Sequence, residues 1–165
     1  PVNPSCVGSV GAPVWRHAEA DLGALADRHD KRDSGVWQDD CADFAILSAG
    51  TGKEDFLHYI VNPRGVCYDA KGAGSGSSFW ESGFTVKTGR EPDANRWTLE
   101  MEIPWTDFGR KPASGEVWRA QFGRNDVTGI QYQGSCWAPT SEGLNNADYL
   151  GVLLFESRDD AGRFN

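Results

Sequence analysis

Few residues in this sequence have the types and spacing of a catalytic site. The histidines His17, His29 and His58 are isolated, and no H-E-x-x-H, G-x-S-x-G or P-loop pattern occurs. Asp40 and Asp43 are two carboxylates near a tryptophan, as in a glycosidase pair. On one strand, however, they would face opposite sides, whereas a glycosidase needs carboxyl groups facing each other across the sugar. We therefore predict that the protein is not an enzyme.

Metal and haem sites are the next chemistry to consider. Oxygen ligands from Asp39, Asp40 or Glu54, together with loop carbonyl groups, would suit a hard cation such as calcium, although no spacing resembles an EF-hand loop. We predict no required cofactor, and keep structural calcium as the alternative. A haem would need an axial ligand, and the single methionine, Met101, falls on the apolar side of a predicted strand, which favours core packing.

The tryptophans carry most of the functional information. Trp97 and Trp118 lie at inward positions of predicted strands and are expected in the core. Trp37 lies in a polar loop just before a strand, where its indole could stack on the C–H face of a sugar ring while polar neighbours bind the hydroxyl groups. The alternative is that Trp37 folds back as a lid on the core.

Residues 96–109 define the element around which the others are arranged. Trp97, Leu99, Met101 and Ile103 alternate with polar residues, which is typical of a strand with one face on a core. Pro104 should end this strand, and a short helical turn should follow and close at Gly109. Further strands are predicted at residues 41–48, 56–62, 66–68, 84–87, 117–125, 136–139 and 150–155.

These short strands, with turns between them, predict an all-β fold, an antiparallel β-sandwich with one or two short helices. In the strand at 56–62 we expect Leu57, Tyr59 and Val61 to point inward, and His58, Ile60 and Asn62 outward. Apolar residues at helical spacing predict a helix over residues 17–28, and residues 1–14 read as an arm or an edge strand. We therefore expect an arm and short helix at 1–35, packed on or extending from a sandwich domain at 36–165.

Composition narrows the class of partner. The chain has 165 residues and a net charge of −8, which argues against nucleic acid or an anionic membrane surface. It has no apolar run long enough to span a bilayer, so we expect no membrane insertion. No charged-then-apolar leader opens the sequence, so we expect the chain to be a mature form or an excised piece. Cys6, Cys41, Cys67 and Cys136 could form two disulfides in three connectivities, or Cys41 and Cys67 could be buried thiols.

Several segments resemble family 9 carbohydrate-binding modules and their DOMON-like relatives. Residues 37–46, which read WQDDCADFAI, resemble the family's Trp-x-x-Asp-x-Val-Glu-Ile-Phe strand. Residues 58–65, HYIVNPRG, resemble its Gln-Phe-x-Val-Asn segment, and residues 97–105, WTLEMEIPW, match its Trp-Thr-Val-Glu-Met-Ala-Ile-Pro signature. Residues 118–125, 135–139 and 150–155 follow in the family's order, so the resemblance covers roughly residues 36–155.

The resemblance implies a jelly-roll β-sandwich, often stabilised by calcium, that binds oligo- or polysaccharide between aromatic side chains. Such modules are extracellular and are attached to secreted glycan-degrading enzymes, so a covalently linked glycoside hydrolase is an expected partner. Carried over by position, Trp37 would be one wall of the sugar site, with Asp43, Asn62 and Asn125 as polar contacts. We add His58 and Arg124 to the predicted sugar contacts because the alternation of the predicted strands puts their side chains on the same face as these residues.

The sequence also departs from the family pattern. The second aromatic wall falls near Leu144 here, so Trp137 or Tyr149 would have to replace it, and Ile60 stands where the family often has a contacting arginine. An early strand of the family is not recognisable in residues 1–35. Either residues 7–15 supply it, or a sheet position is open to another chain. The alternative function is therefore structural: assembly with neighbouring copies through the N-terminal arm.

Overall fold

The computed structural model describes residues 6–8, 13–15, 25–72, 79–94, 96–127, 133–141, 143–144 and 146–156. The larger sheet has the strand order β10-β8-β3-β4-β5, and β9 also pairs with β8. All of its described pairings are antiparallel. Its strands are β3 (Cys41–Leu47), β4 (Leu57–Val61), β5 (Cys67–Lys71), β8 (Val117–Asp126), β9 (Gln133–Cys136) and β10 (Gly151–Leu154).

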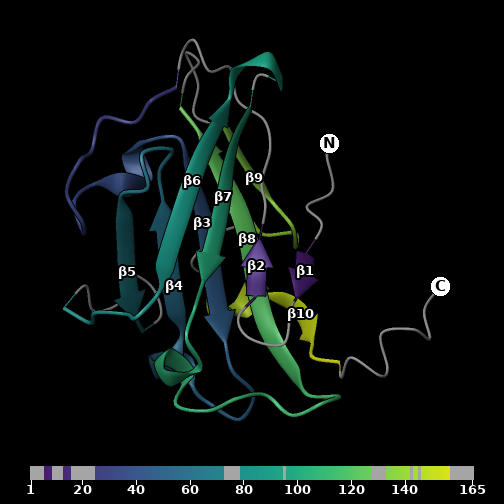
Figure 1. Ribbon diagram of the computed structural model, residues 1–165. Helices are drawn as coiled ribbons and strands as arrows, with labels where there is room; N and C mark the ends of the chain where they lie inside the picture. The colour runs from purple at the N-terminus through teal and green to yellow at the C-terminus, as the bar shows by residue number, and fades with distance from the viewer. Residues whose placement is uncertain are drawn as a thin grey trace.

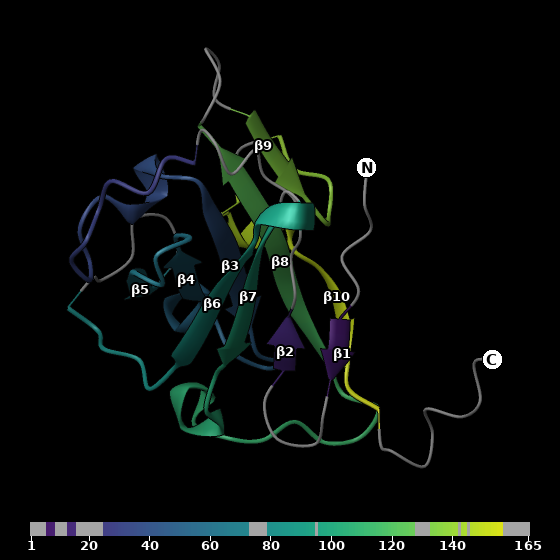
Figure 2. The same cartoon turned by 45° about the horizontal axis from the view of Figure 1, so that its top comes forward.

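A second layer lies across one face of this sheet (Figure 1). It contains the antiparallel pair β6 (Thr85–Glu91) and β7 (Arg96–Glu102). Beside β7 lies β2 (Pro13–Trp15), which pairs with β1 (Cys6–Gly8), as the tilted view in Figure 2 also shows. The predicted all-β antiparallel sandwich is thus confirmed.

The core fills the space between the two layers. β7 contributes Trp97, Leu99 and Met101, all at most 3% exposed, whereas Glu100 and Glu102 on its other side are exposed. The period-two pattern read from the sequence is therefore the pattern of burial. The other buried members of this cluster come mainly from β3, β4 and β8: Ala42, Phe44, Ile46, Leu57, Tyr59, Val61, Trp118, Ala120 and Phe122.

Gly65 adopts a left-handed φ of 79° in the turn between β4 and β5, and its amide donates to the Asn62 carbonyl at 2.9 Å. The local predictions for residues 96–109 are confirmed. The strand of residues 96–102 ends just before Pro104, and the 3-10 helix η4 (Trp105–Phe108) closes at Gly109, with φ 71°. Met101 packs in the core.

The helix predicted over residues 17–28 is not formed in its described part, residues 25–28. Two backbone contacts explain the difference. The Ala26 amide donates to the Asp40 carboxylate at 2.8 Å, and the Asp40 amide donates to the Ala26 carbonyl at 2.7 Å. These long-range bonds use the groups that a helix would pair internally, while Leu25 packs against the core. Residues 16–24 lie outside the described part of the chain.

The strand predicted at 136–139 is displaced toward the N-terminus, since β9 ends at Cys136. Beyond it, the Gln121 side chain takes the place of a neighbouring strand. Its amide oxygen accepts from the Ala138 amide and its nitrogen donates to the Ala138 carbonyl, both at 2.8 Å. Gln121 pairs with Ala45 on the outer face of the sheet, yet it is only 1% exposed.

Cys41, Cys67 and Cys136 are free thiols in this structure. Burial raises the pKa of Cys67 to about 11 and raises that of Cys41 further. Cys41 is fully buried in a cluster with Val36 and Ile60, so the buried-thiol reading fits it. The side chain of Cys6 lies outside the described part. Among the described residues, the helices are single 3-10 turns, and none could cross a membrane.

Candidate functional site

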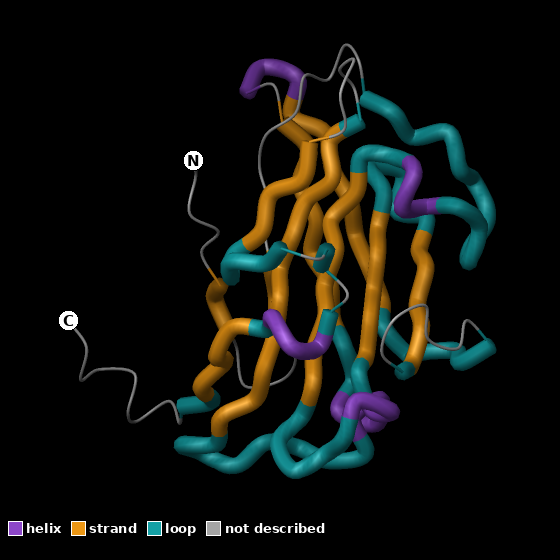
Figure 3. Tube along the Cα trace, turned by 180° about the vertical axis from the view of Figure 1, so that it is seen from behind, coloured by secondary structure: helices purple, strands orange, loops and turns teal. Residues whose placement is uncertain are grey.

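The face of the large sheet that points away from the core is also covered. His58, Ile60 and Asn62 point to this side of β4, as predicted, yet they are at most 6% exposed. Residues 34–40, which include η1 (Val36–Gln38), cover the β3-β4-β5 part of this face. Residues 25–33 lead to them past the edge of the sheet, where the Asp33 amide donates to the Cys67 carbonyl of β5 at 3.0 Å, and residues 25–40 together are called the covering segment. Nearer to β8, η5 (Ala147–Tyr149) covers the same face of the sheet. Figure 3, seen from behind, shows η1 and η5 on this face.

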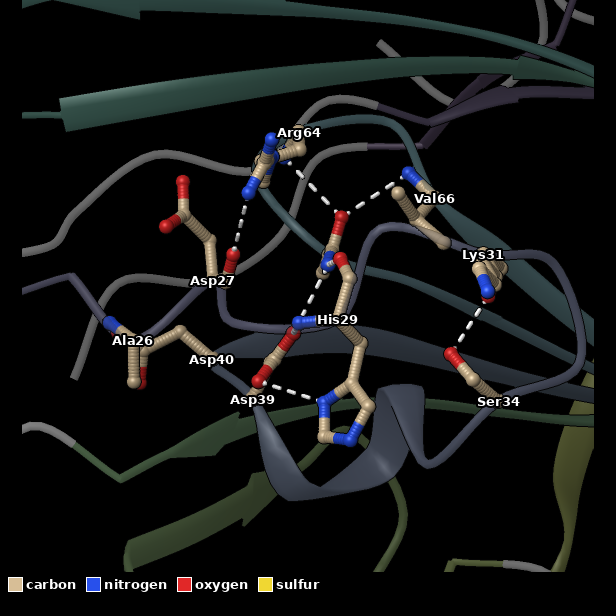
Figure 4. Close-up of polar contacts among 10 residues, drawn as sticks. Ala26, Asp27, His29, Lys31, Ser34, Asp39, Asp40, Arg64 and Val66 are labelled. Carbon is tan, nitrogen blue, oxygen red and sulfur yellow. Dashed lines mark hydrogen bonds and ion pairs between the residues drawn. The ribbon is translucent and has the colours of Figure 1, made fainter.

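Two buried carboxylates hold the covering segment in place (Figure 4). Asp40 accepts from the amides of Ala26 at 2.8 Å and Val127 at 2.7 Å. Asp39 accepts from His29 through both the backbone amide and the ring nitrogen Nδ1, each at 3.0 Å, and from Asn62 Nδ2 at 2.9 Å. Both carboxylates are 0% exposed. They therefore bind distant backbone to the sheet.

The pKa values of these carboxylates move in opposite directions. Burial raises the pKa of Asp40 despite its two backbone hydrogen bonds. Burial also acts on Asp39, but the hydrogen bonds from Asn62 and His29 outweigh it and hold its pKa below the usual value. The surrounding groups are N–H donors, whereas calcium requires oxygen ligands. The donor set thus does not fit a calcium ion at Asp39 or Asp40, and we propose none there.

Asn62, one of the predicted sugar contacts, uses its whole side chain inside the protein. Its nitrogen donates to Asp39 and to the His29 carbonyl at 3.0 Å, and its oxygen accepts from the amides of Arg64 at 3.1 Å and Val66 at 2.9 Å. These four bonds join the turn after β4 to the covering segment. The geometry gives Asn62 a structural position next to the candidate site.

Trp37 lies at the surface of the covering segment. It is 45% exposed, so it is not a lid buried in the core. Its ring meets Tyr68 edge to face, with centroids 5.2 Å apart, and Tyr68 in turn lies 6.1 Å from the His58 ring. Tyr68 is 9% exposed and supports the indole from below. An exposed indole on a rigid aromatic support is a suitable platform for an apolar ring face.

Asp43 and His58 form a buried polar pair beside this platform. His58 Nε2 lies 2.8 Å from Asp43 Oδ1, and both residues are about 5–6% exposed. The register places Asp43 between Gly123 of β8 and Ile60 of β4, and Ile60 pairs with Tyr68. Directly paired residues share a face of a sheet, so these side chains form one row across it.

Leu144 closes the row on the side opposite Trp37. A Cβ at Gly123 would lie 2.3 Å from Leu144 Cδ1, so Leu144 occupies the space that glycine leaves open. Three strand spacings of about 4.8 Å separate β8 from β5, which puts the two sides of the row roughly 14 Å apart. The wall predicted near Leu144 is thus aliphatic.

The remaining predicted residues divide between the two faces. Asn125 pairs with Cys41 on the same face as Asp43, and its Nδ2 lies 3.4 Å from Cys41 Sγ. Arg124 pairs with Ala42 of the core, so it does not share phase with Asp43, and it binds Asp126 at 2.9 Å. Trp137 is 40% exposed and packs on Phe122, also on the core side. Their role in binding stays a prediction.

Sequence reasoning missed Tyr68, although a signal for it existed. In a hairpin centred on Arg64, residues equally distant from the turn pair with each other, which assigns Tyr68 to Ile60 and to the side of the sheet that carries His58. Gly123 carried no such signal, because the loop that fills its space comes from residues about twenty positions later.

No protein-family model matches the sequence, and no curated protein matches it. A solved structure does. It is a protein from Bacteroides uniformis ATCC 8492, provisionally described as carbohydrate-binding, whose crystal structure was determined at 2.70 Å resolution. The TM-score is 0.68 with 19% sequence identity, over 94% of this chain and 80% of that chain. The two proteins share a fold. At this identity the likeness extends to the fold alone.

Proposed function

We propose that this protein is a non-catalytic carbohydrate-binding module whose sugar site is the row from Trp37 to Leu144. The observation that carries the proposal is the 45% exposed indole of Trp37, held edge to face on Tyr68 beside the Asp43–His58 pair. The fold shared with a protein provisionally described as carbohydrate-binding supports it. Neither Asp40, which binds backbone amides, nor Asp43, which binds His58, is arranged as half of a glycosidase pair.

The proposed binding combines stacking with a few hydrogen bonds. A sugar ring would place its C–H face on Trp37 and its hydroxyl groups toward Asp43 and His58. Each hydrogen bond contributes about 0.5–1.5 kcal/mol net, so we expect affinities near 1 μM, about −8 kcal/mol, or weaker. The aliphatic Leu144 replaces the second aromatic wall, which weakens stacking on that side.

The wider setting is part of the same proposal. We place the protein outside the cell, attached to or cooperating with a glycan-degrading enzyme. This setting rests on the resemblance of residues 36–155 to modules of secreted enzymes.

Two exposed tryptophans of similar accessibility provide a matched test. Trp37→Ala should abolish the retardation of the protein in native gels that contain a soluble glycan, because the stacking platform is lost. Trp137→Ala should leave that retardation unchanged, because Trp137 packs on the core side of the sheet. The gels would contain xylan, β-glucan, galactomannan or hydroxyethylcellulose, with near-UV circular dichroism to verify folding.

If Trp137→Ala abolished the retardation and Trp37→Ala left it unchanged, the sugar site would lie near Trp137 on the core side of the sheet. A wild-type protein that passes through every glycan gel without retardation would remove the proposal altogether.

A further inference from the structure

A cleft of about 450 Å³ opens at the other end of the sandwich from Trp37. It lies where η2 (Lys53–Asp55), η4, the end of β5 and residues 80–81 meet, at the lower end of the molecule in Figures 1 and 3. Its volume is within the range of roughly 300–1,000 Å³ that is usual for small-molecule sites.

Two aromatic side chains fixed by the core line this cleft. Trp80 meets the buried Tyr59 edge to face, with centroids 6.1 Å apart, and Phe108 packs on the buried Trp118 at 4.9 Å. Both are partly buried and belong to the rim of the main core cluster. Because their positions are set by packing, they form a preorganised apolar surface, which lowers the entropic cost of binding a ligand.

Hydroxyl and carboxyl groups line the rest of the cleft. The hydroxyls of Ser48 and Thr51 lie 3.2 Å apart. Asp107 is held from both sides, accepting from the Tyr59 hydroxyl at 3.3 Å and from the Gly83 amide at 3.1 Å. These groups suit a ligand that both donates and accepts hydrogen bonds at several positions, as a sugar does.

The charges of the cleft decide which sugars fit. It is lined by three carboxylates, Asp55, Glu81 and Asp107, and one ammonium group, Lys71. Lys71 Nζ binds Asp55 at 2.7 Å, and Arg32 Nε binds Glu81 at 3.1 Å. Asp107 is therefore the carboxylate left without a cationic partner among these lining groups. Its negative charge disfavours phosphates and uronic acids and favours hydroxyl donors.

We propose that this cleft is a second sugar-binding site, which takes a neutral mono- or disaccharide against Trp80 and Phe108. The site is independent of Trp37, because the two lie on different elements at different ends of the sandwich. A protein with both sites could contact two sugars, or two parts of one branched glycan, at the same time.

The test is a titration of the uniformly ¹⁵N-labelled full chain, followed by amide and indole chemical shifts. The probes are cellobiose, maltose, lactose and mannobiose as neutral sugars, and glucuronate and glucose 6-phosphate as anions. The exposed Thr106 is changed in Thr106→Phe to fill the cleft, and the exposed Thr85 of β6 supplies the matched control, Thr85→Phe. Trp37→Ala removes the other site.

We expect at least one neutral sugar to shift Thr51, Gly109 and the Trp80 indole saturably in the wild type, Trp37→Ala and Thr85→Phe. These shifts should vanish in Thr106→Phe, while any shifts around Trp37 remain. If the wild-type protein showed saturable cleft shifts but no shifts around Trp37 with any sugar, only the Trp37 site proposed above would be contradicted.

Three results would overturn the second site. The first is the absence of saturable cleft shifts with every neutral sugar. The second is their persistence in Thr106→Phe or their disappearance in Trp37→Ala. The third is an equal response to the anionic probes.

Discussion

At the scale of single residues, Asp39 was a candidate metal ligand in the sequence, but in the structure its carboxylate accepts hydrogen bonds from His29 and Asn62. Its neighbour Asp40 does the same with two backbone amides. Both acids lie immediately before β3, and both receive N–H donors from segments that the sequence does not place nearby. The candidate site depends on them, because they fix the segment that carries Trp37.

Asp39→Asn should destabilise the protein in a pH-dependent way. The asparagine nitrogen would face the donors of His29 or Asn62, so at neutral pH the free energy of unfolding should fall by about 1–3 kcal/mol. The folded-state pKa of Asp39 lies below its usual value of 3.8, so its stabilisation is present above that value and decreases as pH falls through the folded-state pKa. The gap between wild type and variant should therefore narrow below pH 3.8.

Urea denaturation at neutral pH and through the acidic range measures this gap. The exposed Asp148, paired with Lys53 at 2.7 Å, provides the control. Asp148→Asn should change the free energy of unfolding by less than about 1 kcal/mol. A gap for Asp39→Asn that stays constant with pH would show that its charge has no part in stability.

At the scale of elements, the outer face of the sheet depends on complementary shapes contributed by distant segments. Ala45 and Phe56 pack on Ala147 and Leu150, next to the place where Leu144 covers Gly123. Leu144, Ala147 and Leu150 are thus fitted to the outer face of the sheet, and Leu144 forms one side of the candidate sugar site.

Gly123→Ala should displace Leu144 and lower the free energy of unfolding by about 1 kcal/mol. The new Cβ would lie 2.3 Å from Leu144 Cδ1, which is far inside ordinary contact distance. In a Leu144→Ala background the same change should cost less, with a coupling of at least about 0.5 kcal/mol in a double-mutant cycle measured by urea denaturation. Strictly additive effects would mean that the two residues do not share this space.

At the scale of the whole molecule, one core joins both layers. Trp97 and Leu99 from β7 belong to the same cluster as Phe44 and Phe122 from the large sheet. The outer clusters around Cys41 and Ala45 are smaller and lie under the loops. Stability should therefore depend far more on the β7 residues than on the edge strand β10.

A pair of leucines tests this distribution. Leu99 is 0% exposed and Leu154 is 48% exposed. Leu99→Ala should lower the free energy of unfolding by about 2–5 kcal/mol, whereas Leu154→Ala should change it by about 0.5 kcal/mol or less. Chemical denaturation followed by tryptophan fluorescence gives both values. Comparable losses for the two variants would contradict a single dominant core between the layers.

The sequence by itself determined most of the strands and the direction of the core side chains of β7. Alternation in residues 96–103 places Trp97 and Leu99 inside because a strand has a period of two, and Pro104 and Gly109 end their elements by local backbone rules. Local sequence also placed Trp37 in a polar loop before a strand, and of the two readings it left open, an exposed indole or a lid on the core, the exposure of 45% favours the first.

The tertiary structure alone decided what covers the outer face and what each polar group binds. Asp40 pairs with Ala26 and Val127, and Gln121 pairs with Ala138, through contacts between segments distant in sequence. Such contacts have no periodic signature, because they depend on where loops pass over a finished sheet. The register between β3 and β8, which placed Arg124 on the core side, likewise exists only after the strands have paired.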